Sequence, residues 1–191
     1  MAYLNYEQLE KIGFKSLGKN VLISDKASIY NANLIDVGDN SRIDDFCVIS
    51  GKVWIGRNIH ITIFSNIAGG SEGVYIGDFS TLAYGCNVFS QSDDYSGATM
   101  TNSTIPSQYK CEIKKSVHIG RHCILGTNTI VFPGVVLAEG TSVGAMSLIR
   151  ESTEAWSIYV GNPARRVKSR KRDLLELEKQ FLKYEDKNKI L

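Results

Sequence analysis

Aliphatic residues recur at every sixth position along most of the chain. From Val37 the hexads run VGDNSR, IDDFCV, ISGKVW and IGRNIH, and after ITIFSN and a three-residue expansion they continue as IGDFST and LAYGCN. The pattern resumes after residue 117 with IGRHCI, LGTNTI, VFPGVV, LAEGTS and VGAMSL. The first position is always Ile, Leu or Val, the second is usually Gly, Ala or Asp, and the fifth is small or β-branched in most hexads. Repetition at a short fixed period is typical of a solenoid.

The period predicts the shape of the solenoid. Three hexads make one triangular coil, and equivalent aliphatic residues such as Val37 and Ile55, or Ile119 and Leu137, are 18 residues apart. Coils stacked about 4.8 Å apart would bring the first-position side chains into continuous interior ladders. The fifth position lies near a corner, where only a small side chain fits, and Gly, Asn and Asp supply the freedom that tight turns need. We therefore predict an all-β fold, a left-handed parallel β-helix, in preference to a helical protein or a globular β-sandwich.

The segments outside the repeat predict how the ends of the solenoid are covered. Residues 1–20 include a short amphipathic helix and are expected to form a cap, and residues 21–168 form the β-helix. Residues 169–191 are expected to form a helix beside the other end, with an apolar stripe of Leu174, Leu177, Phe181, Leu182 and Tyr184. The stretch 90–116 departs from the period and is rich in Ser, Thr and Asp, and an insertion of this length is more often functional than accidental.

Composition excludes several classes of protein. The 191 residues are 43% hydrophobic and 22% charged, which suits a single soluble domain, and no apolar run is long enough to span a membrane. The net charge of +2 is too small to suggest a nucleic-acid partner. The four cysteines form no CxxC pair, and no signal peptide is evident, so we expect packing thiols in a reduced cytoplasmic setting.

The last repeats and the segment after them resemble those of the hexapeptide-repeat acyltransferases. The most specific stretch is IGRHCILGTNTIVFPGVVLAEGTSVGAMSLI followed by YVGNPARRVK. This group includes galactoside and maltose O-acetyltransferases, xenobiotic acetyltransferases and the acyltransferases of sugars for O-antigen and other surface polysaccharides. The resemblance implies a homotrimer with active sites in the clefts between prisms. It also implies acetyl-CoA as a co-substrate lying along the coils, and no metal.

The resemblance further points to residues that bind CoA. CoA has a 3′-phosphate and a pyrophosphate, which require fixed cations and backbone N–H donors. Arg165 and Lys168 match family positions that contact these phosphates, and Arg150 is a further candidate. Thr127 and Ala145 match positions whose backbones line the path of the pantetheine. The simpler alternatives are a solvated charge run for the basic residues and ordinary repeat sequence for the other two.

The long insertion lacks a residue that the family resemblance would place there. In many O-acetyltransferases of the family the corresponding loop carries the catalytic histidine, whereas here the matching stretch is Ser92-Asp93-Asp94-Tyr95, and the loop contains no histidine. In family members this loop projects towards a neighbouring subunit and helps to form the acceptor site. The usual catalytic assignment therefore does not transfer to this chain.

The three histidines of the chain supply the alternative bases. By strand alternation His60 and His118 point outward, and His122 lies near a corner. We prefer His60 as the base, because it lies on the coil before the insertion and imidazole titrates near working pH. Asp93 or Asp94 is expected to orient His60 or to bind acceptor hydroxyls. The alternatives are a histidine with a structural hydrogen bond and two acids that form a loop turn.

The missing loop histidine also bears on the acceptor. A hydroxyl needs strong base assistance, whereas an amine needs only to lose its extra proton. We therefore expect N-acylation of a nucleotide-linked amino-deoxy sugar, with O-acetylation of a sugar hydroxyl as the alternative. A zinc enzyme related to carbonic anhydrase, with three histidines meeting across a subunit interface, is a distant alternative on the same fold. A non-catalytic scaffold is another.

Overall fold

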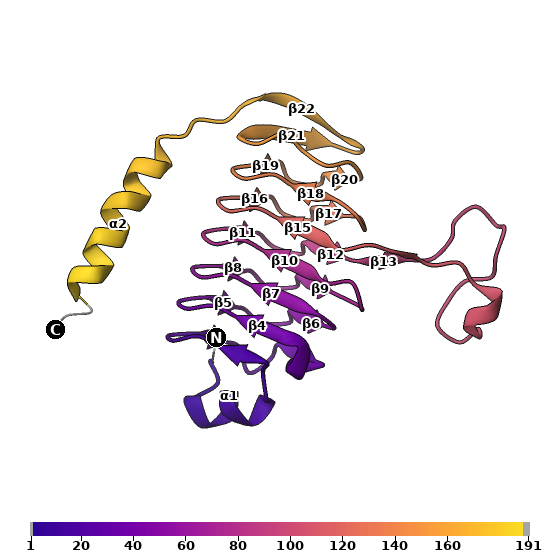
Figure 1. Ribbon diagram of the computed structural model, residues 1–191, viewed down its shortest axis with the longest axis horizontal. Helices are drawn as coiled ribbons and strands as arrows, with labels where there is room; N and C mark the ends of the chain where they lie inside the picture. The colour runs from indigo at the N-terminus through magenta and orange to yellow at the C-terminus, as the bar shows by residue number, and fades with distance from the viewer. Residues whose placement is uncertain (1, 189–191) are drawn as a thin grey trace.

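The computed structural model describes residues 2–188. Figure 1 shows a three-sided stack of short strands, with a helix near each terminus and one long excursion that leaves the prism. The predicted hexapeptide β-helix is confirmed. The excursion begins with β13 (Gln91–Ser92), returns through β14 (Ile113–Lys114), and holds the short 3-10 helix η2 (Ser107–Tyr109).

Short strands pair into three sheets, one for each side of the prism. In stacking order, sheet I contains β1 (Ser16–Leu17), β4 (Ile35–Val37), β7 (Val53–Ile55), β10 (Val74–Ile76), β15 (Val117–Ile119) and β18 (Val136–Leu137). Sheet II contains β2 (Leu22–Ile23), β5 (Arg42–Ile43), β8 (His60–Ile61), β11 (Thr81–Leu82), β16 (Ile124–Leu125), β19 (Ser142–Val143), β21 (Ser157–Gly161) and β22 (Ala164–Ser169). Sheet III contains β3 (Ser28–Tyr30), β6 (Val48–Ser50), β9 (Asn66–Ala68), β12 (Asn87–Phe89), β17 (Ile130–Val131) and β20 (Leu148–Ile149).

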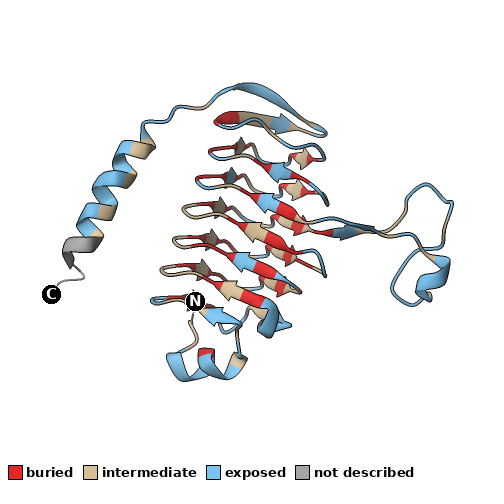
Figure 2. Cartoon of the chain, in the orientation of Figure 1, coloured by how far each residue is buried: buried red, intermediate tan, exposed pale blue. Residues whose placement is uncertain are grey.

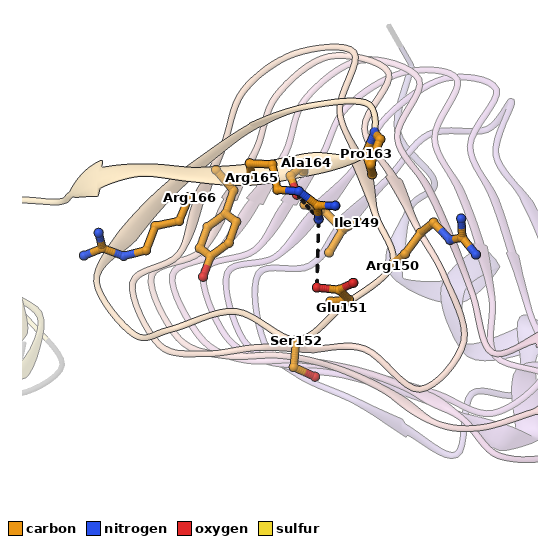
Figure 3. A pocket seen from close by; sticks show the side chains of 9 residues that line it. Ile149, Arg150, Glu151, Ser152, Pro163, Ala164, Arg165 and Arg166 are labelled. Atoms are coloured by element: carbon orange, nitrogen blue, oxygen red, sulfur yellow. Dashed lines mark hydrogen bonds and ion pairs between the residues drawn. The ribbon is translucent and has the colours of Figure 1, made fainter.

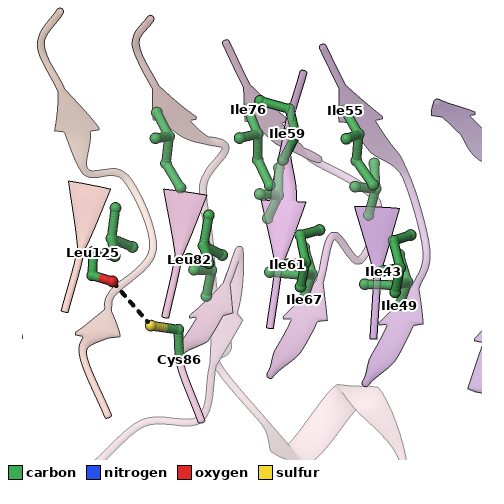
Figure 4. Close-up of a cluster of buried hydrophobic side chains, with 14 of the residues drawn as sticks. Ile43, Ile49, Ile55, Ile59, Ile61, Ile67, Ile76, Leu82, Cys86 and Leu125 are labelled. Carbon is green, nitrogen blue, oxygen red and sulfur yellow. Dashed lines mark hydrogen bonds between the residues drawn. The ribbon is translucent and has the colours of Figure 1, made fainter. Parts of the chain in front are cut away.

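The core is the set of interior ladders that the repeat predicts. In sheet II the parallel register aligns Ile43, Ile61, Leu82 and Leu125, and all four are fully buried (Figure 4). Burial of each such side chain contributes about 1.5–3 kcal/mol. Figure 2 shows that most of the buried residues lie inside the prism, whereas the loop and most of both helices are exposed. The fold is therefore held from within, and its outer faces are free for other roles.

The N-terminal end is closed by helix α1 (Tyr6–Ile12). Asn5 and Gln8 form a capping box, and Gly13 ends the helix with a left-handed backbone. The buried Leu9 packs on the first coil. The repeat itself begins earlier than its most regular part suggests, because β1 lies within residues 1–20 and pairs with β4. The connection into β4 contains the 3-10 helix η1 (Ala32–Leu34).

Helix α2 (Leu174–Asn188) takes a different path from the expected one. It runs back along the side of the prism and does not lie beside the end. Glu178 accepts hydrogen bonds from Arg121 and His122, and further along the helix Glu185 pairs with Arg57. Residues 170–173 turn the chain back, which brings the helix over aromatic side chains that protrude there. Residues 189–191, also part of the expected helix, lie outside the described residues.

Two corners of the prism differ in what covers them. At each corner one residue per coil, here called the rung residue, lies above its equivalent in the coil below. The covered corner, between sheets I and II, lies under α2, and its rungs are Asn20, Asn40, Asn58, Phe79, His122, Gly140 and Trp156. The open corner joins sheets II and III, and its rungs are Lys26, Phe46, Phe64, Gly85, Asn128 and Met146. All of these residues except Lys26 have a positive φ.

Candidate active site

His60 lies on the outer face of sheet II, as predicted, with its side chain 37% exposed. Its Nε2 is 2.9 Å from Oδ2 of Asp44, whose side chain is only 3% exposed. The other carboxylate oxygen of Asp44 accepts a hydrogen bond from Nε of Arg42 at 2.6 Å, and this bond raises the pKa of the arginine. Because an ionised carboxylate only accepts, the proton of a neutral His60 ring is on Nε2, and Nδ1 is left as the basic nitrogen.

Asp44 is a residue that the sequence interpretation missed. It occupies the second position of its hexad, and the register of β5 with β8 pairs Arg42 with His60. Asp44 is therefore diagonal to His60 on the next coil. Because Asp is among the usual residues at this hexad position, the repeat pattern gave no signal that Asp44 has a role of its own. The arrangement is a histidine oriented by a buried carboxylate, which is what a general base requires.

The two loop aspartates hold the loop together. Asp94 accepts hydrogen bonds from the backbone N–H of Ser96 at 2.8 Å and from both N–H and hydroxyl of Thr99, and these bonds lower the pKa of its carboxyl. Asp93 accepts from the backbone of Asn102 and lines a cavity of about 390 Å³ at the base of the loop. In Figure 1 the loop projects from the side of the prism opposite β8. Within one chain, His60 is therefore not brought together with either aspartate.

A second cavity lies at the C-terminal end of the solenoid. The NPAR stretch forms the turn of the antiparallel hairpin β21–β22, and Arg150, Arg165 and Arg166 line a cavity of about 430 Å³ with Glu151 (Figure 3). Arg165 is exposed and lies 3.9 Å from Glu151, so its guanidinium is available to an anion. Arg166, which the sequence analysis did not single out, is held by Glu154 and by Ser157.

Two further predicted CoA-binding residues extend from this cavity along the open corner. Thr127 and Ala145 directly precede rungs in successive coils, and the carbonyl of Thr127 accepts a hydrogen bond from Met146. Lys168 lies on β22 opposite Ile158, two residues after the covered-corner rung Trp156, and therefore does not share this corner. The structure thus brings Arg150 and Arg165 together and aligns Thr127 and Ala145 below them. A long, flexible ligand with phosphates at one end fits this arrangement.

The other two histidines lie on different faces. His118 is on the outer face of sheet I, where its ring stacks on Tyr75 with centroids 4.7 Å apart. His122 is buried at the covered corner. Within residues 2–188 no group of three or more His, Cys, Asp or Glu could hold a metal ion. None of the helices described is long and apolar enough to cross a membrane.

Comparison with known proteins yields relatives that align along almost the whole chain. No protein-family model matches it. It is 44% identical over 184 residues, 95% of either chain, to the dTDP-4-amino-4,6-dideoxy-D-glucose acyltransferase of Escherichia coli. AntD, an N-acyltransferase from Bacillus cereus solved with dTDP and 3-hydroxybutyryl-CoA, is 48% identical with a TM-score of 0.95, covering 96% of this chain and 98% of that one. A maltose O-acetyltransferase from Clostridium difficile 630, 19% identical with a TM-score of 0.56 over 88% of this chain and 78% of that one, shares the fold.

Proposed function

Because the chain belongs to the hexapeptide-repeat acyltransferases, the family of its Escherichia coli relative, we propose that it acetylates the amine of a dTDP-linked 4-amino-4,6-dideoxy sugar. The observation that supports this most is the end-to-end similarity to enzymes whose named substrates or bound ligands are such sugars and CoA. One structure of an AntD variant contains dTDP-4-amino-4,6-dideoxyglucose and CoA together. Acetyl-CoA is the proposed donor, and a larger acyl group is the variation that the AntD complex suggests.

The residues of the site suit amine acylation. Nδ1 of His60 takes the extra proton from the ammonium form of the acceptor, and the free amine then attacks the thioester carbonyl carbon. The C–N bond forms, the C–S bond breaks, and the departing CoA thiolate takes up the proton that the nitrogen loses. Asp44 acts as a positioning residue, because it holds the ring of His60 in place. Arg150, Arg165 and Lys168 bind the CoA phosphates, and Thr127 and Ala145 line the pantetheine.

The proposed assembly is a homotrimer that works in the cytoplasm on sugars for O-antigen or another surface polysaccharide. Residues 90–116 extend away from their own prism (Figure 1), which suits a loop that reaches a neighbouring subunit. Asp93 and Asp94 would then meet the acceptor or His60 of that subunit. All four cysteines are unpaired, in keeping with a reducing compartment.

A substrate panel tests the proposal. Acetyl-CoA is supplied with dTDP-4-amino-4,6-dideoxyglucose, with the corresponding 4-hydroxy nucleotide sugar and with free sugars, and thiol release is measured. We expect the amino nucleotide sugar to give a kcat/KM at least about 100-fold above the others, because the amine is the better nucleophile. Faster release with the hydroxy sugar would instead establish O-acetylation. No thiol release with any acceptor, together with no CoA binding by calorimetry, would remove the proposed function.

A further inference from the structure

The carboxylate of Asp44 is buried between two side chains on the outer face of sheet II. Its Oδ1 accepts a hydrogen bond from Nε of Arg42 at 2.6 Å, and its Oδ2 is 2.9 Å from Nε2 of His60. The Asp44 side chain is only 3% exposed, so water does little to solvate it. A buried carboxylate is tolerated where hydrogen-bond donors and cations replace the lost water. Arg42 supplies a permanent cation, because a guanidinium does not lose its proton in a protein.

The protonation of Asp44 decides which ring nitrogen of His60 is basic. An ionised carboxylate can only accept, so the proton of a neutral ring is then on Nε2 and the free lone pair is on Nδ1. A protonated carboxyl would instead donate to Nε2, and the ring proton would be on Nδ1. In that state Nδ1 could not take a proton from the acceptor. A group that keeps Asp44 ionised therefore also keeps His60 able to act as a base.

The N-terminal segment contacts the same guanidinium. The guanidinium carbon of Arg42 is 5.6 Å from the centroid of the Tyr3 ring, which is within the range of a cation–π contact. Tyr3 is fixed beside β2 by an antiparallel bridge with Ser24, and the backbone N–H of Leu4 donates to the carbonyl of Ile23 at 2.9 Å. Strand β2 pairs with β5, which carries Arg42. The segment that closes the N-terminal end therefore also touches the network around His60.

We propose that Arg42, supported by Tyr3, is a positioning residue that keeps Asp44 ionised and so fixes the basic nitrogen of His60 at Nδ1, an inference that rests on the proposed function. The guanidinium donates to the carboxylate, and the ring of Tyr3 limits the orientations that the guanidinium can take. The effect on acyl transfer passes through two hydrogen bonds and needs no contact between Arg42 and a substrate. The N-terminal segment thereby contributes to the rate as well as to the fold.

A second arginine–carboxylate–histidine network supplies the comparison. At the covered corner Glu178 contacts both Arg121 and His122, and the Arg121 guanidinium carbon is 5.8 Å from the centroid of Phe79. The two arginine side chains are similarly exposed, at 48% for Arg121 and 41% for Arg42. His122 is buried, so its ring is not accessible to a substrate. The two networks thus contain the same groups and differ in whether the histidine can meet a substrate.

Three variants of the full chain test the proposal. Arg42→Gln removes the cation, Arg42→Lys keeps a cationic donor, and Arg121→Gln is the matched control. Nitrogen-15 NMR at about pH 9, where imidazole is neutral, reports which ring nitrogen of His60 holds the proton. We expect Nε2–H in the wild type and a mixture with Nδ1–H in Arg42→Gln.

Steady-state kinetics of the same variants measures the effect on the reaction. The kcat of Arg42→Gln should fall about 10-fold or more, because part of the protein holds the wrong tautomer, and the KM for acetyl-CoA should not change. Arg42→Lys should recover kcat to within about 3-fold of the wild type. In Arg121→Gln both kcat and the His60 spectrum should be unaltered, because that cation belongs to the other network.

The contribution of the N-terminal segment is tested by Tyr3→Leu, which keeps an apolar side chain and removes the ring. We expect kcat to fall about 2- to 3-fold, in the same direction as in Arg42→Gln. Circular dichroism and the mass by light scattering should stay the same. An unaltered kcat would remove Tyr3 from the network.

Several results would overturn the role of Arg42. An Nδ1–H ring in the wild type, a tautomer that does not respond to Arg42→Gln, or a changed tautomer with an unchanged kcat would each do so. An equal fall of kcat in Arg42→Gln and Arg121→Gln would show only a general effect of charge. If Arg42→Gln does not fold, the wild-type tautomer and the rate of Arg42→Lys still decide, because a 10-fold loss in the lysine variant contradicts the proposal.

These failures are distinct from a failure of the proposed function. In each of them the proposed function stands if the wild-type protein acylates amino sugars. Conversely, a tautomer that follows Arg42 in a protein that releases no thiol would defeat the proposed function and keep the link between Arg42 and His60.

Discussion

The covered and open corners are built by the same backbone device and differ in what lies outside them. Both place left-handed rung residues in successive coils, and both insert aromatic rings where Gly or Asn would suffice. At the covered corner α2 supplies the partners, and Phe181 packs edge-on against Phe79 with centroids 6.2 Å apart. At the open corner the rings of Phe46 and Phe64 stack on each other and remain more than half exposed. The two corners therefore differ in whether the C-terminal helix covers their aromatic rungs.

The two histidine–carboxylate pairs repeat this contrast. Nε2 of His122 is 2.9 Å from Glu178, and Nε2 of His60 is 2.9 Å from Asp44. The His122 side chain is 6% exposed beneath α2, whereas the His60 side chain is 37% exposed. Equal hydrogen-bond geometry thus serves two purposes, because only the exposed ring has a nitrogen that a substrate can reach.

The largest expected effect separates these two histidines. His60→Ala should lower kcat by about 100- to 10,000-fold, because it removes the proposed base, with little change in stability. His122→Ala should keep kcat within about 2-fold and lower the free energy of unfolding by about 2–3 kcal/mol, because a buried ring and a hydrogen bond are lost. Steady-state kinetics and urea unfolding measure both. Unaltered turnover in His60→Ala would exclude His60 as the base.

Asp44→Asn sharpens the first prediction. If Asp44 positions His60, the amide variant should lower kcat, although by less than His60→Ala does, because the ring is held less well. A merely structural aspartate would change stability and leave kcat unchanged.

The next effect concerns the basic residues at the C-terminal end of the solenoid. Replacing both Arg165 and Lys168 by alanine should raise the KM for acetyl-CoA by about 10- to 100-fold, because two charge-assisted contacts to phosphate are lost. The kcat at saturation should change little. Lys171→Ala, in the same basic run, is the matched control and should have no effect. An equal rise of the KM for acetyl-CoA in the double variant and in Lys171→Ala would indicate that CoA responds only to the overall positive charge of this segment.

A smaller effect is expected from the helix over the covered corner. Phe181→Ala should lower the free energy of unfolding by about 1–2 kcal/mol, because it removes the edge-on contact with Phe79. Leu177→Ala, on the more exposed side of the helix, should cost less than about 0.5 kcal/mol. Neither variant should alter kcat/KM. A loss of activity in Phe181→Ala would show that the covered corner also takes part in function.

The smallest difference between the two corners is expected in the reactivity of the buried thiols inside the prism, where the corners are alike. Cys86 follows a rung of the open corner and Cys123 follows a rung of the covered corner, and burial raises the pKa of both thiols to about 11. At pH 8 iodoacetamide should therefore modify the exposed Cys111 and react only slowly with both buried thiols. The modification rates of Cys86 and Cys123 should lie within about 2-fold of each other. Faster reaction of Cys86 would mean that solvent reaches the interior of the prism at the open corner.

The raised thiol pKa values also set a pH window for stability. A thiol whose pKa is higher in the folded chain stabilises the fold fully below its unfolded pKa, about 8.5, and progressively less as the pH rises towards 11. Urea unfolding at pH 8 and at pH 10 should show the loss.

The interior of this fold was predictable from the sequence because one rule repeats in every coil. Ile43, Ile61 and Leu82 each had to point inward, and no distant contact could change that. The outer features depend on single contacts between coils or with the tail. Asp44 contacts His60 only because the two residues lie diagonally on adjacent coils. Helix α2 follows the side of the prism because Glu178 and Phe181 contact the rung residues His122 and Phe79 there. No hexad position encodes such pairings.

The most direct test of the open corner as the ligand groove is a crystal structure grown with CoA and dTDP. We expect CoA along Thr127 and Ala145 with its phosphates near Arg165, and the sugar nucleotide near His60. CoA bound at the covered corner or on the outer face of sheet I would contradict this assignment.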